Sequence, residues 1–270
     1  MQYSTSSVTF MALLASAVTG YPLAAPGNET APTTPKFDSN TSSGAELDAL
    51  KKALAGAFTY SERQEILAPN APDASNYVFQ FVNNTVTGGT GGTIALSTKN
   101  NFPALSASNT ALAIGFVNPC GLNVPHLHPR GGEFLTVVQG QLVAGLVLEV
   151  NDGSFGSIVG EAEPEKGPIP QVISTLNQYQ GFMFPQGETH WQFNPTCEPA
   201  VFAASFDSAD PGRTQLARNF FSNTPDEVLI AAVGGNIETL DGSKINAFQS
   251  QIPNEYAVIM KECAVRCGFA

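Results

Sequence analysis

The sequence predicts an all-β protein, a β-sandwich or β-barrel with a short helix before it and helices after it. Short runs of alternating, β-branched or aromatic residues recur through the middle of the chain, glycine and proline separate them, and no helical pattern interrupts them. Many short strands in such an arrangement are typical of sandwiches and barrels. The predicted strands are Tyr77–Val82, Ala111–Val117, Phe134–Val138, Gln141–Val150, Gln171–Leu176, Gly181–Phe184, Trp191–Phe193 and Ala200–Phe206.

Helical patterns flank this strand region. The leucines of Ala45–Leu54 recur at helical intervals, with acidic residues in the early turns. Thr224-Pro225-Asp226-Glu227 has the form of a capping box with proline at the first helical position, and Gly234-Gly235 would end that helix. Further helices are expected over Gly242–Gln249 and from about Asn254 to Cys267.

Composition narrows the class of protein. The chain has 270 residues, 43% of them hydrophobic, which is ample for a core, and a net charge of −11 with a pI near 4.6. Nucleic acid binding needs clustered lysine and arginine, so this charge argues against a nucleic acid partner, and it also disfavours an anionic membrane surface. We expect a soluble protein with a small-molecule substrate.

The amino-terminal segment predicts export. Val8–Val18 is apolar but too short to span a bilayer, so residues 1–20 are interpreted as a signal peptide. No lysine or arginine precedes it, and a buried first helix is the alternative. Residues 21–43, rich in proline, serine, threonine and asparagine, are expected to form a flexible linker. Sequons at Asn28, Asn40 and Asn83 predict glycosylation and support an extracellular location.

All three histidines of the chain lie in two short motifs. In a strand, His126 and His128 project from the same face, and after the turn at Pro129–Gly132 the carboxylate of Glu133 opens the next strand. His190 would arrive from a distant strand. Imidazole and carboxylate are the usual ligands of first-row transition metals, and four protein ligands leave positions open for water or substrate. The alternative is a set of core histidines with a surface glutamate.

The first motif is His126-Leu127-His128-Pro129-Arg130-Gly131-Gly132-Glu133, with Gly140 beyond it. The second motif is Pro185-Gln186-Gly187-Glu188-Thr189-His190, with Asn194 beyond it. Together they resemble the paired boxes of germin-like and spherulin-like cupins. The resemblance implies a double-stranded β-helix, a jelly-roll barrel, over a cupin domain at residues 44–222, followed by a helical extension at residues 223–270. It implies a manganese ion, or another first-row divalent metal, held by His126, His128, Glu133 and His190. It also implies a homo-oligomer, a dimer or a hexamer. The chain departs from the germin pattern at Cys120, where germins often have glycine, and at Tyr179.

The resemblance implies superoxide dismutation or oxalate oxidation. Asn123 matches one of two asparagines that orient oxalate in oxalate-oxidising germins, and we assign it a catalytic role; the alternative is a turn residue that bonds its own backbone. Ala113 occupies the position of the second asparagine, so superoxide dismutase-like activity is favoured over oxalate oxidase. Arg130 could meet an anionic substrate or pair with Glu188. A non-catalytic, metal-stabilised wall or storage protein is the alternative to an enzyme.

Four cysteines in an exported protein predict two disulfides with three possible pairings. If the strands of His126 and His190 are antiparallel neighbours, Cys120 and Cys197 lie opposite each other at the far end of the same pair. We therefore expect a Cys120–Cys197 bond and, as the remainder, Cys263–Cys267. Helical neighbours four residues apart hold their Cβ atoms too far apart for an easy disulfide, so two free thiols at the tail are the alternative.

Overall fold

The computed structural model describes residues 44–69, 75–84, 86–87, 89–148, 171–232, 249–253 and 255–269, all within one compact unit that spans residues 34–270. The expected signal peptide, the linker, Asn28 and Asn40 lie outside the described residues, as do Gly234-Gly235 and nearly all of Gly242–Gln249.

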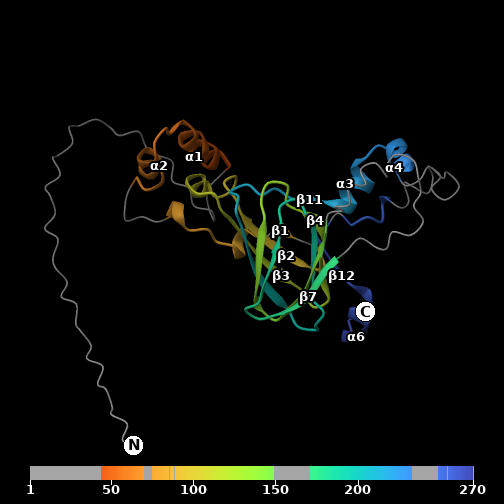
Figure 1. Ribbon diagram of the computed structural model, residues 1–270. Helices are drawn as coiled ribbons and strands as arrows, with labels where there is room; N and C mark the ends of the chain where they lie inside the picture. Colours follow the sequence, from red (N-terminus) through yellow and green to blue (C-terminus); the bar gives the residue numbers. More distant parts are fainter. Residues whose placement is uncertain are drawn as a thin grey trace, which may run out of the picture. The chain divides into compact units, whose positions relative to one another are not determined.

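The centre of the protein consists of two antiparallel sheets (Figure 1). The first sheet has, in spatial order, β1 (Val86–Thr87), β2 (Gly92–Ser97), β3 (Ala111–Val117), β10 (Ala200–Phe206), β5 (Glu133–Gln139) and β8 (Gly181–Phe184). The second sheet has β11 (Thr214–Gln215), β4 (Gly121–Leu127), β9 (Thr189–Phe193), β6 (Gln141–Val147) and β7 (Gln171–Asn177), with β12 (Ala257–Ile259) also paired to β4. Each of the predicted strands from Ala111 onward corresponds to one of these strands.

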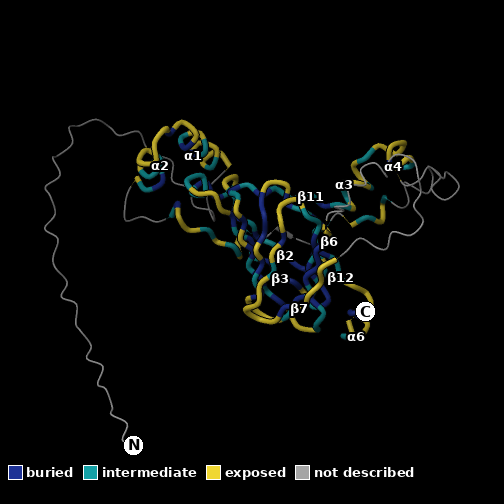
Figure 2. The backbone as a smooth tube through the Cα atoms, in the orientation of Figure 1, coloured by how far each residue is buried: buried dark blue, intermediate teal, exposed yellow. Residues whose placement is uncertain are grey.

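The main hydrophobic core lies between the two sheets, because one face of each strand alternates into it. The seven residues of β3 alternate strictly between buried and partly buried, which is the period expected of a strand with one face in the core. Figure 2 shows the buried positions concentrated along the strands. The buried core residues are Ala111, Ala113, Val117, Leu135, Val137, Leu142, Ala144, Leu146, Leu176, Phe184, Ala200, Phe202, Ala204 and Phe206.

Gln139-Gly140 forms a tight turn between β5 and β6, but the two strands pair with other strands and not with each other. Gly140 has a φ of +80°, a conformation that favours glycine, and Ala200 and the carbonyl of Pro199 crowd the space where a Cβ would stand. This tight turn starts β6 directly after β5, although the two strands belong to different sheets.

The amino-terminal helical region contains two helices instead of one. The expected helix is present as α1 (Gly44–Gly56), and α2 (Tyr60–Leu67) follows it. The start of α2 is a capping box in which Thr59 Oγ1 accepts a hydrogen bond from the Glu62 N–H and Glu62 Oε2 accepts one from the Thr59 N–H. Backbone hydrogen bonds from Thr59 and Phe58 lower the pKa of Glu62. Leu50, Leu54 and Leu67 join the helices in a small core of their own.

The predicted strand at Tyr77–Val82 is wrong. The segment forms two 3-10 turns, η1 (Ser75–Tyr77) and η2 (Val82–Asn84). Asn84 uses its side-chain amide to bond the carbonyl of Gln80, a local bond that competes with strand pairing. The aromatic ring of Phe79 packs on Phe81 and Phe102, with ring centroids 4.9 and 5.4 Å apart, so the alternating pattern reflects a small aromatic cluster.

The carboxy-terminal segments partly match the predicted helices. α3 (Leu216–Asn223) precedes α4 (Asp226–Ala232), which begins one residue later than expected, at Asp226 and not at Pro225. Thr224, the expected first residue of a capping box, instead caps the end of α3, and its hydroxyl donates to the Asn219 carbonyl. The expected helix from Asn254 to Cys267 is instead β12 and a shorter helix, α6 (Lys261–Cys267). Ala257-Val258-Ile259 is rich in β-branched residues and pairs with the free edge of β4, where a strand gains hydrogen bonds that a helix would forgo.

The predicted disulfide pairing is also wrong. The bonds are Cys120–Cys263 and Cys197–Cys267, each with Cα atoms 5.4 Å apart. Cys120 lies beside the segment that carries Cys197, as expected, because its N–H donates to the carbonyl of the neighbouring Thr196. However, β12 runs antiparallel to β4 and the Met260 N–H donates to the Cys120 carbonyl, which brings Cys263 within reach. α6 thereby contributes both of its cysteines, and all four cysteines are bonded.

The two departures from the germin pattern share one backbone feature. Cys120 and Tyr179 have φ angles of +60° and +66°, and among the described residues they alone combine a positive φ with a side chain. The left-handed region disfavours side chains with a Cβ, which gives a physical reason for glycine at such positions.

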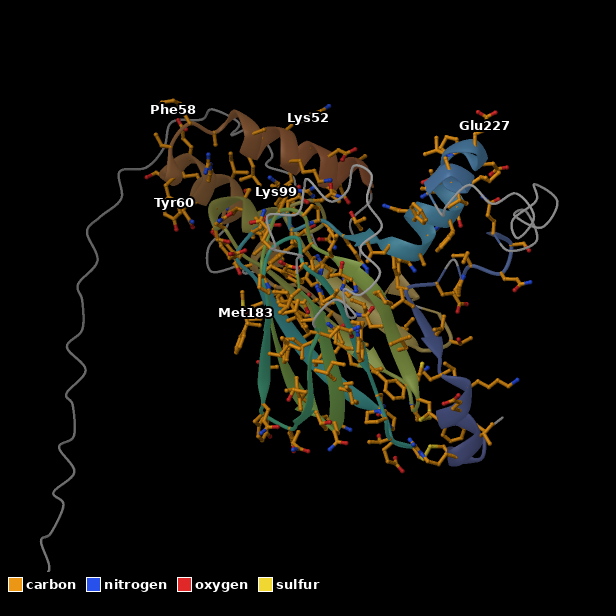
Figure 3. All side chains as sticks on the ribbon, turned by 45° about the vertical axis from the view of Figure 1, so that its right-hand side comes forward. Lys52, Phe58, Tyr60, Lys99, Met183 and Glu227 are labelled. Atoms are coloured by element: carbon orange, nitrogen blue, oxygen red, sulfur yellow. A yellow bond between two sulfur atoms is a disulfide. The ribbon has the colours of Figure 1, made fainter. Side chains whose placement is uncertain are left out.

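No helix in the described part of the chain is both long enough and apolar enough to cross a bilayer. Five large apolar side chains of β5, β7 and β8 are solvent-exposed: Phe134, Val138, Val172, Ile173 and Met183. Figure 3 shows Met183 pointing away from the strands.

Candidate metal centre

The structure brings the four predicted ligands together from both sheets. His126 lies in β4 directly opposite His190 in β9, and His128 follows the end of β4. Glu133 is the first residue of β5 in the other sheet, delivered by the turn at Pro129–Gly132. The cluster of ligands therefore bridges the two sheets at one end of the core.

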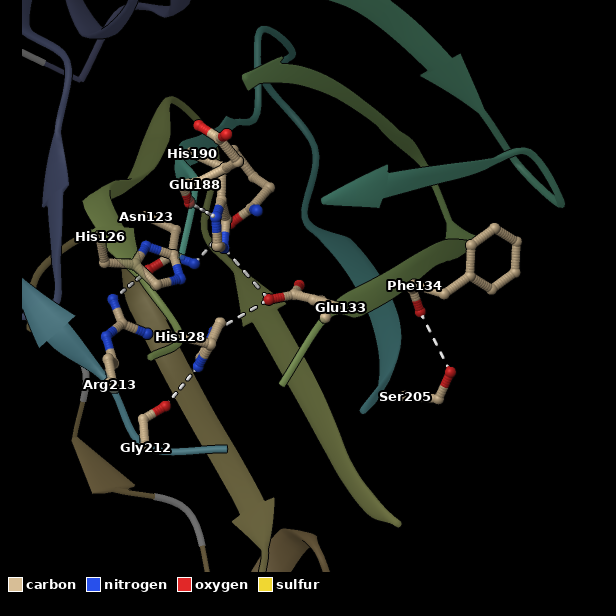
Figure 4. Close-up of polar contacts among 12 residues, drawn as sticks. Asn123, His126, His128, Glu133, Phe134, Glu188, His190, Ser205, Gly212 and Arg213 are labelled. Atoms are coloured by element: carbon tan, nitrogen blue, oxygen red, sulfur yellow. Dashed lines mark hydrogen bonds and ion pairs between the residues drawn. The ribbon is translucent and has the colours of Figure 1, made fainter. Parts of the chain in front are cut away.

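The four side chains are buried and converge on one point (Figure 4). One nitrogen or carboxylate oxygen from each of them lies within 4.8 Å of all the others. Glu133 Oε2 is 3.0 Å from His128 Nε2 and 3.2 Å from His190 Nε2. His126, His128, Glu133 and His190 are only 1%, 4%, 3% and 1% exposed, so water does not compete freely for these atoms.

Backbone carbonyls orient all three imidazole rings. The Nδ1 of His126 lies 2.8 Å from the Val124 carbonyl, that of His190 lies 2.8 Å from the Glu188 carbonyl, and that of His128 contacts the Gly212 carbonyl. A carbonyl can only accept, so each Nδ1 carries the proton and each Nε2 is left to bind an ion. Three Nε2 atoms and one carboxylate aimed at one point form a donor set that fits a first-row divalent metal.

Aromatic rings hold two of the ligands from the side. Phe184 of β8 stacks on His190, with ring centroids 4.3 Å apart and planes inclined by 16°. Phe206 at the end of β10 meets His128 edge to face at 4.7 Å. These aromatic neighbours restrict rotation of the imidazoles without offering competing polar atoms. Phe182 packs against the core. Trp191 alternates along β9 with the buried His190 and Gln192, so it lies on the opposite face of the sheet, where it packs over Gly145.

Electrostatics keep the ligands in their binding forms. Burial by itself would raise the pKa of Glu133, but hydrogen bonds and charge from His128 and His190 outweigh burial and lower the pKa to about 2. Burial lowers the pKa of His126 well below its ordinary value, and the positive charge of Arg213 adds to this effect. The centre thus holds an ionised carboxylate and a neutral His126 at neutral pH.

A cavity of about 310 Å³ borders the cluster. Three of the four ligands, His126, His128 and Glu133, line it. Apolar side chains form much of the remaining wall, and polar side chains line the rest. The other lining residues are Asn84, Ile94, Leu96, Thr98, Asn100, Asn101, Ala113, Asn123, Phe202, Phe206, Arg213 and Tyr256.

Asn123 is a buried residue of β4 that lines this cavity, and its side chain bonds to other side chains. Its Oδ1 accepts a hydrogen bond of 2.8 Å from Arg213 Nη2, and its Nδ2 donates one of 2.5 Å to Gln192 Oε1. Both of these partners are distant in sequence, unlike those of a turn residue. Ala113 lines the same cavity, as expected, and brings no amide.

Arg213 is a residue of the site that was not predicted from the sequence. It follows Gly212, whose carbonyl meets His128, and precedes β11, which pairs with β4 at Leu127 and His126. Nothing in the linear sequence distinguishes it from the other basic residues, because its place depends on the return of the chain after β10. Neither proposed role of Arg130 is seen. Arg130 pairs with Asp210, with Nη2 and Oδ1 3.0 Å apart.

Comparison with known proteins agrees with this site and fold. The cupin family model matches residues 81–240. Spherulin-1A of Physarum polycephalum is 33% identical over 230 residues, covering 84% of this chain and 82% of the spherulin. Germin-like protein 8-5 of Oryza sativa subsp. japonica is 34% identical over 155 residues, 56% of this chain and 62% of that protein.

Solved structures share the fold at low sequence identity. An oxalate oxidase in complex with the substrate analogue glycolate covers 68% of this chain and 83% of its own, at 20% identity and a TM-score of 0.54. The oxalate decarboxylase from Bacillus subtilis at pH 4.6 covers 67% of this chain and 40% of its own, at 16% identity and a TM-score of 0.51. With its two antiparallel sheets and its buried cluster of three histidines and one glutamate, the chain belongs to the cupin family, and spherulins and germin-like proteins are among its relatives.

Proposed function

We propose that this protein is an exported, manganese-dependent oxidoreductase with superoxide dismutase-like activity, and that oxalate oxidation is its less favoured reaction. One observation carries the proposal: four buried ligands converge beside a cavity of about 310 Å³. A metal that only stabilised the fold would need no space beside it, whereas a catalytic metal needs room for a reactant.

His126, His128, Glu133 and His190 would hold the metal. Manganese fits a mixed nitrogen and carboxylate donor set, and when bound it supplies one-electron chemistry. In superoxide dismutation one superoxide ion is oxidised to dioxygen, and a second is reduced to hydrogen peroxide with the uptake of two protons. The protein's part is to keep the ligands aligned through the carbonyl bonds of their Nδ1 atoms and to limit the entry of water.

A structural role for the ion is the second candidate, and the topology favours it in one respect. Glu133 belongs to the first sheet, while His126 and His190 belong to the second, so a shared ion would tie the two sheets together. In that role the metal would raise the free energy of unfolding without any turnover.

Metal analysis of the purified protein, followed by superoxide and oxalate assays on metal-replete samples, tests the proposal. We expect manganese bound in about one equivalent and an activity that His190→Ala abolishes. Glu188→Gln is the matched control, because Glu188 contributes its backbone carbonyl, which the substitution keeps. Activity unchanged by His190→Ala, or a protein that carries zinc alone, would overturn the redox function. Loss of stability in His190→Ala with no turnover in the wild type would support the structural role.

Export and self-assembly are further parts of the proposal. Two disulfides are typical of proteins from oxidising compartments, and Asn83 is exposed at its predicted glycosylation site. The exposed apolar residues of β5, β7 and β8 give a homo-oligomer a surface to bury. Recovery of glycosylated protein from the culture medium and light scattering of the purified protein would test the two parts separately.

A further inference from the structure

The cavity beside the metal centre contains a cation, Arg213, that forms no ion pair with any carboxylate in the described part of the chain. Its Nη2 donates a hydrogen bond to the neutral amide of Asn123. Its Nε is buried without a hydrogen-bond partner in that part of the chain. Leaving a guanidinium N–H buried and unpaired costs free energy, which a ligand or a neighbouring group would normally offset.

The position of Arg213 is held from several sides. Gly212 has a φ of +70°, a left-handed conformation that favours glycine, at the turn that presents Arg213. On the other side the guanidinium lies over the ring of Tyr256, 4.9 Å from its centroid. Figure 4 shows Arg213 beside His126 and Asn123. The side chain is therefore preorganised, and a ligand would lose little free energy in ordering it.

Arg213 remains positively charged at neutral pH. Burial lowers its pKa to about 10, and the nearby Glu133 carboxylate and Tyr256 partly offset the effect of burial. With a divalent ion in the centre, the positive charge beside the cavity exceeds the single negative charge of Glu133. Such a site attracts an anion.

The opposite wall indicates what kind of anion. Ile94, Leu96, Phe202 and Phe206 line the cavity with apolar carbon atoms. A purely inorganic anion would leave this wall without a partner, whereas a carboxylate with a hydrocarbon chain would satisfy both sides. The planar guanidinium also suits the two oxygens of a carboxylate.

We propose that Arg213 is the anchor of a binding site for a small carboxylate with an apolar carbon skeleton, in the cavity beside the metal centre. This inference rests on the proposed function, because it assigns a class of substrate to the same cavity. Arg213 also gives the cavity a polar group that can orient a substrate, a role that the family resemblance assigned to an amide at the position of Ala113.

Calorimetric titration of the full-length, manganese-loaded protein tests the inference without requiring turnover. Butyrate and butyramide have the same shape but differ in charge, and acetate has a shorter chain. We expect butyrate to bind about tenfold more tightly than acetate, because its two additional methylene groups meet the apolar wall. Butyramide should bind more weakly than butyrate.

Arg213→Gln should weaken butyrate binding by about 10- to 100-fold, the usual loss for a charged hydrogen bond, and leave butyramide binding unchanged. Arg213→Lys should lie between the two proteins, because lysine keeps the charge and loses the planar fork. Lys52→Gln is the matched control: it removes the same charge from a side chain that is exposed on α1 and points into solvent (Figure 3).

Equal binding of butyrate by wild type and Arg213→Gln, or equal binding of butyrate and butyramide by the wild type, would overturn the inference. The second comparison needs no variant and stands even if Arg213→Gln fails to fold. If carboxylate binding depends on Arg213 but the protein has no redox turnover, the oxidoreductase proposal is wrong and this inference stands. Redox turnover without carboxylate binding would remove this inference and leave that proposal intact.

Discussion

The two ends of β4 are held in different ways. The histidine end carries His126 and His128, and the cysteine end begins at Cys120; they are separated by roughly 20 Å of extended strand. At the histidine end, buried polar side chains face one another and the cavity. No disulfide joins the described residues there. At the cysteine end, two disulfides join strand and loop to α6, across sequence separations of 143 and 70 residues. The ligand site is thus preorganised by hydrogen bonds and packing, while the chain terminus is secured by covalent bonds.

This difference has consequences for the cavity. Tyr256, the residue before β12, lines the cavity because the tail runs along β4 from the cysteine end. The Val124 N–H donates to the Tyr256 carbonyl, only two residues from His126. The disulfides therefore secure one wall of the cavity but none of the four metal ligands, which suggests that the two ends can be disrupted separately.

The largest expected effect is at the histidine end. Glu133→Gln removes the single carboxylate of the cluster and should lower manganese affinity by at least about 100-fold, because loss of outer contacts alone costs 10- to 100-fold. Competition with a chelating dye measures this affinity. Glu188→Gln, two residues before His190, is the control and should bind manganese as the wild type does. Equal affinity in Glu133→Gln and wild type would show that Glu133 is no ligand.

The second effect is expected at the cysteine end. Replacing Cys120 and Cys263 together by serine should lower the free energy of unfolding by about 2–4 kcal/mol, because a cross-link that closes a long loop is lost. Both residues must change at once, since Cys120 Sγ lies 3.6 Å from Cys267 Sγ and a single free thiol could exchange with the second disulfide. Manganese content should not change. Loss of manganese in this variant would contradict the independence of the two ends.

Tryptic digestion without reduction checks the pairing itself. Cleavage at lysine and arginine places the four cysteines on separate peptides, residues 100–130, 167–213, 262–266 and 267–270. The structure predicts that 100–130 is linked to 262–266, and 167–213 to 267–270. A link between 100–130 and 167–213 would instead support the pairing expected from strand register.

The smallest effect concerns the strained turns at the same end as the cysteines. Tyr179 has a φ of +66° and is 78% exposed. Replacing it by glycine should therefore relieve backbone strain and remove few packing contacts. Tyr179→Gly should raise the free energy of unfolding by up to about 1 kcal/mol, since the left-handed conformation costs roughly 1–2 kcal/mol with a Cβ and glycine adds unfolded-state entropy.

The neighbouring substitution Gln178→Gly is the control for this turn. Gln178 has no positive φ and donates a hydrogen bond to the Val138 carbonyl, so glycine should destabilise the protein there. Chemical denaturation of the two variants measures both changes. Destabilisation by Tyr179→Gly would show that the tyrosine makes contacts that outweigh its backbone strain.

Local patterns in the sequence predicted the histidine end well. The two-residue period of a strand places His126 and His128 on one face, and the short turn that follows delivers Glu133, so three of the ligands depend on neighbours within eight residues. The capping box of α2 was equally local, since Thr59 and Glu62 have the required spacing, and it was overlooked. The alternation of apolar and polar residues in Tyr77–Val82 led to a wrong strand prediction, because a small aromatic cluster and a paired strand can produce the same sequence pattern.

By itself the sequence determined the class of fold and the four ligand residues. Only the tertiary structure decided which cysteines pair, that residues 257–259 form a strand, and that Arg213 reaches the cavity. The physical reason is the same in each case. These outcomes depend on where a segment more than 70 residues away meets β4, and that meeting is decided by the packing of the whole chain, which no local pattern records.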